Sequence, residues 1–307
     1  MADKRGQRIQ DVVWRLEALA FDVATVFLRL LPVDFASDLG AFLLRWIGPL
    51  SGTQKTVEQN IRIAFPDMSA AERKRLGIAQ WANFGRYCFE MALMDRLTPA
   101  KGRVEVVGAE RLADIANSDE ASVYVSGHFA NFEVMAAVLM DAGIKCQVTY
   151  RPTNNPYFDK RIIESRRKYG ISMFAPKGEA AAIRGLYAAL KRGEAIAILS
   201  DQKFNEGITD LFFGQPARSA TGAIRLVLRT GARLQLGYIE RVKSARFRAV
   251  VCEPIYLENT DDPEADLAHG VRLLNAFLEE RVRARPEEWW CWVHRRWPDE
   301  VYAALAN

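Results

Sequence analysis

The chain has 307 residues, half of them hydrophobic, and a formal net charge of +4 at pH 7. This suits one main globular domain with a large core, because no repeat or low-complexity segment divides the chain. The charge is too small to indicate a nucleic-acid partner, although it is compatible with an anionic lipid surface or an acidic protein. The four cysteines form no CxxC motif. Neither a metal site nor a disulfide framework is therefore expected, and a reducing location is favoured.

The first fifty residues predict two amphipathic helices. From 12 to 33 the sequence is mostly apolar, but Arg15, Asp22 and Arg29 recur every seven residues and so share one helical face. In a transmembrane helix each of these charges would cost roughly 2.5 to 3.5 kcal/mol near the bilayer centre, so an interfacial helix is favoured. The segment 35–47 repeats the design. We expect a helical hairpin that anchors the protein by lying on a membrane, with an amphipathic pair packed on the protein's own core as the alternative.

The middle of the chain predicts further helices. Ser69 and Glu72 have the spacing of a capping box, which marks a helix start after the turn at Pro66. Beyond Val104 strands and helices alternate, which predicts an α/β fold with a mixed central sheet flanked by helices. We expect strands near 121–126, 145–150, 194–200, 234–240 and 247–252, and helices near 131–142, 157–169, 178–192, 218–230 and 265–284.

A histidine and a glutamate lie at one of these strand–helix junctions. His128 follows the strand, and Glu133 falls in the first turn of the next helix. Within one continuous helix these side chains would point about 140° apart, whereas across a junction they can face each other. A carboxylate in a first helical turn stays ionised, and beside an imidazole it orients the ring and raises its basicity. The pair predicts a His–Glu general base; a histidine that merely caps the helix is the alternative.

Several motifs accompany this pair. They are NIRIAFP from Asn60, HFANFE from His128, YRPTNNP from Tyr150, the DQ pair at Asp201 and EEWWCWVHRRW from Glu287. Together they resemble the bacterial lipid A biosynthesis acyltransferases, late enzymes that add secondary lauroyl or myristoyl chains. The likeness runs to Trp297. It implies a fold like that of the glycerolipid acyltransferases, with an acyltransferase domain over 51–307 behind a membrane-associated segment over 1–50.

The resemblance also implies a reaction. An acyl group would pass from acyl carrier protein to a hydroxyl of a lipid A precursor at the cytoplasmic face of the bacterial inner membrane. His128 would remove the proton while Glu133 holds its tautomer, so neither a covalent enzyme intermediate nor a cofactor is required. Arg166 falls where the family places a functional arginine and would stabilise the oxyanion. The alternative is that Arg166 belongs to a solvated basic helix face.

Four residues are predicted to bind substrate. Pro152 extends the backbone at Arg151, which we interpret as a phosphate or acceptor contact at a strand end. Asn131, in the same motif as His128, is assigned to the substrate as well. Asp201 and Gln202 would orient the substrate, or else serve only as turn residues. Because His128, Arg151 and Asp201 each follow a strand, we expect these strand ends to converge.

The chain closes with tryptophans, for which we expect a structural or membrane-facing role. These are Trp289, Trp290, Trp292 and Trp297, with His294, Arg295 and Arg296 beside them. Arginines on or beside the helix near 218–230 could meet an acidic carrier protein or lipid phosphates, although a plain solvated helix is as consistent. They are Arg218, Arg225, Arg229 and Arg233.

Three other functions fit parts of this pattern. A glycerophospholipid acyltransferase would have an aspartate in place of Glu133 and a basic residue in the FNEGITD segment from Phe204, which has none. Acylation of another glycolipid or phospholipid stays open. A non-catalytic lipid-binding protein would share the anchor and the arginines, but it would not need His128 and Glu133. A serine hydrolase is disfavoured because no GxSxG motif is present.

Overall fold

A seven-stranded mixed sheet forms the centre of this computed structural model, which describes residues 3–118, 120–150, 152–168, 174–176 and 180–306. The strand order is β1-β9-β8-β2-β5-β3-β4, and a separate hairpin is formed by β6 and β7. Only β8 and β9 pair antiparallel within the large sheet, so β1 and β9 run against the other five strands. The strands are β1 (Val104–Val107), β2 (Ser122–Ser126), β3 (Cys146–Tyr150), β4 (Phe174–Pro176), β5 (Ala195–Leu199), β6 (Ile208–Phe212), β7 (Gln215–Ser219), β8 (Arg233–Lys243) and β9 (Arg246–Ile255).

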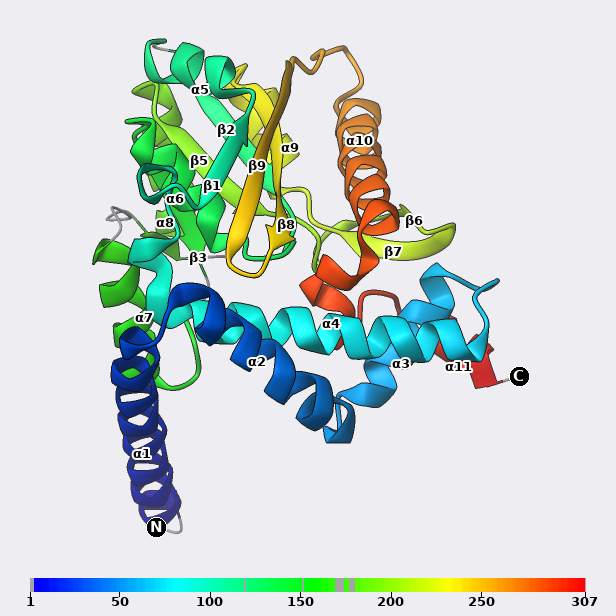
Figure 1. Cartoon of the computed structure of the whole chain (residues 1–307). Helices are drawn as coiled ribbons and strands as arrows, with labels where there is room; N and C mark the ends of the chain where they lie inside the picture. Colours follow the sequence, from blue (N-terminus) through cyan, green and yellow to red (C-terminus); the bar gives the residue numbers. More distant parts are fainter. Residues whose placement is uncertain (1–2, 119, 151, 169–173, 177–179, 307) are drawn as a thin grey trace.

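Helices cover both faces of the sheet (Figure 1). The central strand β2 is buried along its whole length, and its side chains alternate between two cores. Tyr124 packs with α5 and α6, whereas Val123 and Val125 pack with α8, α9 and α10. The helices are α1 (Asp3–Leu30), α2 (Val33–Ile47), α3 (Gln54–Ala64), α4 (Ala70–Glu90), α5 (Ala109–Ala116), α6 (Glu133–Asp141), α7 (Pro156–Lys168), α8 (Ala180–Lys191), α9 (Gly222–Thr230), α10 (Pro263–Ala284) and α11 (Asp299–Ala303).

The α/β fold and all five predicted strands are confirmed, and so is the Ser69–Glu72 capping box. Sequence patterns missed β1 and β4, which have only four and three residues, and also the β6–β7 hairpin. The predicted helix near 218–230 begins only at Gly222, because Gln215–Ser219 is β7 and pairs with β6. Gly231 caps the end of this helix in the left-handed conformation.

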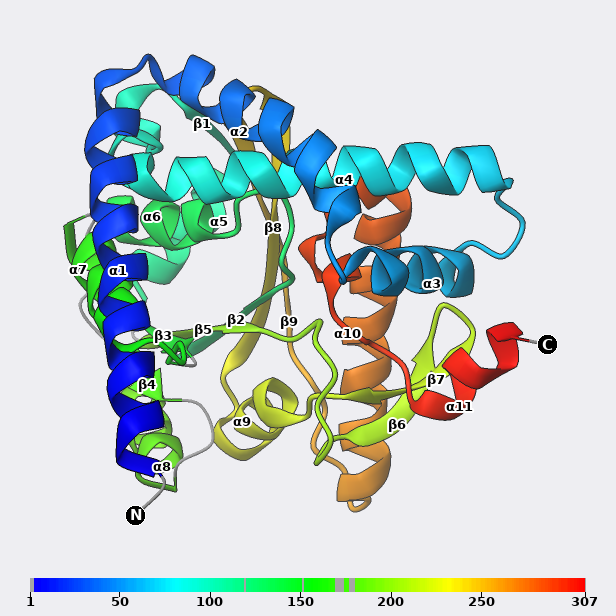
Figure 2. The same cartoon turned by 90° about the horizontal axis from the view of Figure 1, so that it is seen from below.

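The two N-terminal helices are amphipathic, but they do not form a hairpin. α1 lies against α7, whereas α2 packs along α4 (Figures 1 and 2). The predicted charged stripe of α1 faces the protein, because Asp22 pairs with Arg161 and Arg29 pairs with Asp95. The opposite side of α1 and one side of α2 expose apolar residues. They are Ile9, Val12, Val13, Leu16, Leu19, Val23, Val26, Phe27 and Leu30 on α1, and Phe35, Phe42, Trp46 and Ile47 on α2.

No helix in the described part of the chain has both the length and the hydrophobicity that are needed to span a bilayer. Asp22 and Arg29 of α1 point toward the protein, and most of its large hydrophobic residues point to solvent.

The crossing of α2 over α4 depends on two glycines. A Cβ on Gly40 would overlap the carbonyl oxygen of Gly85, and a Cβ on Gly85 would overlap that of Gly40. We expect Gly40→Ala to lower the free energy of unfolding by about 1–3 kcal/mol, because the overpacked helices must separate. Gly185→Ala in α8, where a Cβ meets open space, should instead raise it by about 0.5–1 kcal/mol. Thermal unfolding of both variants tests this, and equal effects would contradict it.

Candidate active site

The predicted histidine lies at the carboxyl end of β2, and its ring is held by an aspartate at the carboxyl end of the neighbouring strand β5. His128 Nδ1 lies 2.6 Å from Asp201 Oδ1, and the backbone N–H of His128 donates to Asp201 Oδ2 at 2.7 Å. Because β2 and β5 are parallel and in register, their ends meet at one edge of the sheet. An ionised Asp201 accepts the Nδ1 proton, which leaves the lone pair of the neutral ring on Nε2.

Asp201 is fully buried, yet it stays ionised. Burial alone would raise its pKa, but the charge and hydrogen bonds of His128, together with the indole N–H of Trp289, hold the pKa of Asp201 well below its ordinary value. Trp289 Nε1 donates to Oδ2 at 2.8 Å, and the Cys291 thiol lies 3.4 Å from the same oxygen. Burial and the neighbouring Asp201 raise the pKa of Cys291, so it remains a thiol. The imidazole of His128 and the thiol of Cys291 thus lie close together because both hydrogen-bond to the Asp201 carboxylate.

The loop that carries His128 is fastened to the C-terminal tryptophan segment. Ala130 N–H donates to the carbonyl of Glu288 at 2.9 Å, and Trp290 N–H donates to the carbonyl of His128 at 2.9 Å. Ala130 has a φ of 48°, a left-handed conformation that costs a non-glycine residue free energy and persists only where its surroundings enforce it. The segment from Glu288 to Trp290 supplies that constraint.

Aromatic rings surround the imidazole. Trp290 stacks on His128 with ring centroids 5.1 Å apart and an interplanar angle of 17°, and Phe132 meets it edge-on at 4.7 Å. His294 contacts Trp290, with the two ring centroids 5.1 Å apart. Burial and the nearby His128 lower the pKa of His294, which favours a neutral ring. The His128 side chain keeps 13% of its surface exposed, so a substrate can reach it.

The predicted Glu133 and Arg166 form an ion pair of their own. Arg166 Nε donates to Glu133 Oε2 at 3.0 Å, and its Nη2 also pairs with Oε1, so the contact is bidentate. Both side chains line a narrow cavity of about 80 Å³ between α6 and strands β2, β3 and β5. The remaining lining is mainly apolar and includes Tyr124, Phe132, Met135, Ala136, Leu139, Val148, Ala197 and Leu199.

This arrangement changes three sequence expectations. The carboxylate on the His128 ring is Asp201 rather than Glu133. Asp201 was expected to touch substrate, but it is fully buried and its carboxylate contacts the imidazole instead. Asn131 was also assigned to substrate binding, yet it is fully buried and donates to Glu90 Oε2 at 2.9 Å, so it belongs to the core.

The remaining predicted residues differ in where they lie. Gln202 follows Asp201 and is half-buried at the same edge of the sheet. Arg151 lies outside the residues that the structure describes. Trp289, Trp292 and Trp297 are fully buried, which confirms a structural role and excludes a membrane-facing one. Arg233 pairs with Glu120 and Arg296 is buried, so neither is available to a carrier protein; burial lowers the pKa of Arg296 to about 10.

The sequence profile of the bacterial lipid A biosynthesis acyltransferases matches residues 17–299. This chain belongs to that family. The predicted family and the acyltransferase class are therefore confirmed. The matched range includes His128, Asp201 and the tryptophan segment, so the candidate site lies within the part of the chain that the family shares.

Individual members of the lipid A acyltransferases are distant relatives. The lipid A biosynthesis lauroyltransferase of Escherichia coli K12 is 26% identical over 269 residues, 84% of this chain and 82% of that protein. The palmitoleoyltransferase of the same organism is 23% identical over 256 residues, 80% of this chain and 79% of its own length. Among solved structures, the 1-acyl-sn-glycerophosphate acyltransferase PlsC of Thermotoga maritima matches 82% of this chain and 98% of its own, with 13% identity and a TM-score of 0.38.

Sequence patterns did not identify the role of the tryptophan segment in the site. Trp289 and Cys291 reach Asp201, and Trp290 covers His128, although all three lie about ninety residues beyond Asp201 in the chain. The one available signal was the unusual density of tryptophans, which indicated packing but gave no partner.

The ionised state of Asp201 gives the fold a pH dependence. Because its pKa in the folded protein lies below the ordinary value of about 3.9, the carboxylate stabilises the fold at neutral pH. This contribution is lost as the pH falls below about 4 toward the folded-state pKa. We expect Asp201→Asn to lower the free energy of unfolding by about 2–3 kcal/mol at pH 7, and the difference from wild type should shrink below about pH 4.

Denaturant unfolding across this pH range measures that difference. Asp141→Asn, which changes an exposed carboxylate at the end of α6, is the matched control and should have little effect. A difference for Asp201→Asn that persists unchanged into acid would contradict the ionised state.

Proposed function

We propose that this enzyme transfers a fatty acyl group from acyl carrier protein to a hydroxyl of a lipid A precursor, with His128 as general base. The observation that carries this proposal is the His128–Asp201 pair, whose Nε2 has no hydrogen-bond partner among the described residues. The family assignment supports acyl transfer in lipid A biosynthesis, and with it the lipid A acceptor. A coenzyme A thioester would use the same chemistry, so the donor is an assayable part of the proposal.

The proposed reaction is a direct transfer. Nε2 of His128 takes the proton of the acceptor hydroxyl while the hydroxyl oxygen attacks the thioester carbonyl. The carbon–oxygen bond forms, the carbon–sulfur bond breaks, and the imidazolium returns the proton to the leaving thiolate. Asp201 keeps the proton on Nδ1 and stabilises the imidazolium, as a buried aspartate does in hydrolase triads. The acceptor oxygen is the nucleophile, so no acyl-enzyme forms.

Arg166 is proposed to stabilise the negative charge that develops on the thioester carbonyl oxygen. Its planar fork is fixed by the bidentate contact with Glu133. A guanidinium that is already held in place loses little conformational freedom when the negative charge develops on the carbonyl oxygen. It therefore stabilises the transition state more than the bound substrate. In this account Glu133 acts on Arg166 rather than on the imidazole.

The apolar slot beside Glu133 and Arg166 is proposed to receive the first part of the acyl chain. Its walls are hydrocarbon and aromatic, and its polar end is the ion pair, which matches a chain that begins at a polar thioester. At about 80 Å³ the slot is far smaller than ordinary ligand cavities, so it must widen to admit a full chain.

We further propose that α1 and α2 rest their exposed apolar residues on the cytoplasmic face of the bacterial inner membrane. A lipid acceptor is confined to a membrane, so the enzyme must work at its surface. The exposed hydrophobic side of α1, and the pairing of its Asp22 and Arg29 with the protein, support a peripheral, interfacial helix. The functional division into a membrane segment over 1–50 and an acyltransferase domain over 51–307 stays a prediction.

Loss of the base should abolish turnover. We expect His128→Ala and Asp201→Asn each to lower kcat by roughly 10²–10⁴-fold, because the attacking hydroxyl then lacks a correctly protonated base. The assay supplies acyl carrier protein thioesters and tetra-acylated, Kdo-bearing lipid A precursor, and mass spectrometry measures the added acyl chain. His269→Ala, far along the chain on α10, is the histidine control and should keep its activity.

The outcomes separate the alternatives. A mass gain only with a coenzyme A thioester, or only on a glycerophospholipid or another glycolipid, would redirect the substrate assignment and keep the mechanism. Unchanged turnover in His128→Ala would refute the base. No transfer with any donor or acceptor would favour a non-catalytic lipid-binding protein.

The slot predicts chain-length selection. We expect Ala136→Leu, which adds bulk to its wall, to lower kcat/KM for long acyl donors by about 10-fold or more relative to short ones. Ala113→Leu places the same bulk on the exposed side of α5 and should leave the ratio unchanged. Competition between a long and a short thioester in one tube measures the ratio directly. An equal loss for both donors would place the acyl chain elsewhere.

A further inference from the structure

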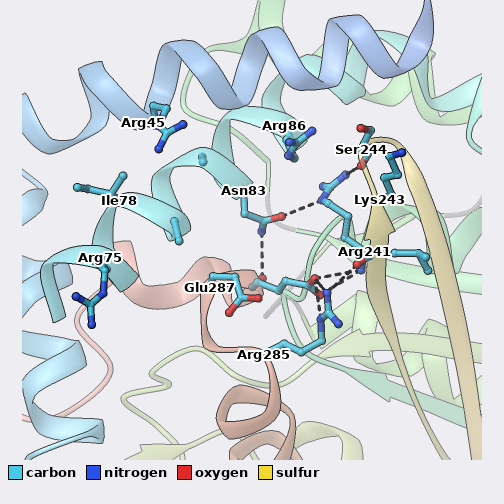
Figure 3. A pocket seen from close by; sticks show the side chains of 14 residues that line it. Arg45, Arg75, Ile78, Asn83, Arg86, Arg241, Lys243, Ser244, Arg285 and Glu287 are labelled. Carbon is cyan, nitrogen blue, oxygen red and sulfur yellow. Dashed lines mark hydrogen bonds and ion pairs between the residues drawn. The ribbon is translucent and has the colours of Figure 1, made fainter. Parts of the chain in front are cut away.

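A second, larger cavity lies on the other side of α4 from the catalytic histidine. It encloses about 580 Å³ between α2, α4, the tip of the β8–β9 hairpin and the segment 285–288 (Figure 3). On α4 its lining includes Ile78, Ala82 and Arg86, which recur every fourth residue and therefore share one face. Phe84, which joins the aromatic cluster around Trp290, lies about 200° around the helix from Ala82. The cavity is therefore separate from the catalytic site.

Positive charge dominates this cavity. Three of its cations are already neutralised: Arg86 pairs with Asp38, Arg241 with Glu90, and Arg285 with Glu288. Arg45, Arg75 and Lys243 also line it, and all three are exposed. None of these three has an ion pair within the described part of the chain. The lining also holds two carboxylates, and among the described residues Glu288 is paired with Arg285 and Glu287 has no ion pair.

The three unpaired cations come from three different elements, α2, α4 and the β8–β9 hairpin (Figure 3). Because these elements pack together, the cavity carries positive groups at several points of its lining. Anions with several oxygens suit such a set, since guanidinium and ammonium groups can each donate to a different oxygen. A phosphate group has this chemistry.

Exposed hydrophobic residues identify the source of the phosphate. Trp46 follows Arg45 on α2 and is 67% exposed, and Val242 lines the cavity beside Lys243 and is 55% exposed. On α2, Arg45 lies about 60° around the helix from the exposed Phe42, so the cation borders the apolar side of that helix. Cations that border an exposed apolar stripe with a tryptophan are typical of surfaces at lipid headgroup depth.

We propose that this cavity, which we call the α2–α4 groove, binds the phosphate headgroups of anionic bilayer lipids through Arg45, Arg75 and Lys243. This inference extends the membrane part of the proposed function and is independent of the catalytic part. The apolar stripe of α1 and α2 enters the interface, and the groove holds headgroups beside it. Glu288 lines the groove, and its carbonyl holds Ala130 in the catalytic loop, so the bound membrane lies next to the segment that fastens His128.

The test compares two variants that lose the same charge. The groove variant carries Arg45→Gln, Arg75→Gln and Lys243→Gln. The control variant carries Arg184→Gln, Lys191→Gln and Arg272→Gln, which neutralise exposed cations on α8 and α10. Cosedimentation measures the affinity of each full-length protein for vesicles of phosphatidylcholine alone and of phosphatidylcholine with an equal amount of phosphatidylglycerol.

We expect the groove variant to lose about 100-fold in affinity for the anionic vesicles, since each cation near a charged bilayer contributes about fivefold. The control variant should stay within a few-fold of wild type, because charges beyond about 10 Å are screened at physiological salt. All three proteins should bind the uncharged vesicles equally. His128→Ala should bind both vesicles as wild type does, which separates this test from that of catalysis.

Three results would overturn the proposal. An equal loss in the two variants would indicate general attraction by net charge, and an undiminished affinity in the groove variant would remove the contact. Weaker binding of acyl carrier protein by the groove variant, with vesicle binding unchanged, would assign the groove to an acidic protein. Thermal unfolding of both variants verifies that they are folded, and we expect this because the replaced side chains have no described ion pairs.

Discussion

The buried carboxylate of Asp201 is the constraint on which the site depends. One oxygen accepts from the ring of His128, and the other accepts from the His128 backbone and from Trp289. A charge buried without partners would cost several kcal/mol, so these donors must stay in place for the carboxylate to remain ionised. The same bonds that stabilise the charge also fix the imidazole, which joins the stability of the fold to the geometry of the site.

The constraint brings distant parts of the chain together. β2 and β5 supply the two functional side chains because parallel strands in register end at the same edge of the sheet. The segment from Glu288 to Trp290 then closes the site from the far end of the chain, and it holds Ala130 in a left-handed conformation. Strained residues near an active site are expected where the surrounding contacts determine the backbone. The buried tryptophans beside this segment give it the rigidity that this role requires.

A different principle organises the surface. α1 turns Asp22 and Arg29 toward the protein, and both α1 and α2 leave hydrophobic residues exposed, which reverses the usual arrangement of a soluble helix. Gly40 and Gly85 let α2 lie close along α4, so the exposed stripe of α2 is held in a fixed relation to the groove. Under the proposed function, this arrangement holds the bilayer at one orientation while the thioester donor approaches from water.

The sequence by itself determined the fold class, five of the strands and the placement of His128 and Glu133 at a strand–helix junction. These features depend on local periodicity and on turn residues, which act over a few positions. The motifs also pointed to the family. Short strands such as β1 and β4, whose place in the sheet depends on their neighbours, were not predictable in this way.

Only the tertiary structure decided which carboxylate meets the imidazole. Asp201 and Glu133 both follow strand ends, and no local pattern states that β5 lies beside β2 and aligns Asp201 with the ring. Tertiary packing likewise turned Asn131 into a core residue and gave Glu133 to Arg166. The groove of Arg45, Arg75 and Lys243 has no sequence signature at all, since its three cations come from separate elements that meet only when the chain folds. Local interactions select elements, whereas the contacts that build a site are long-range and depend on the order in which the strands pair.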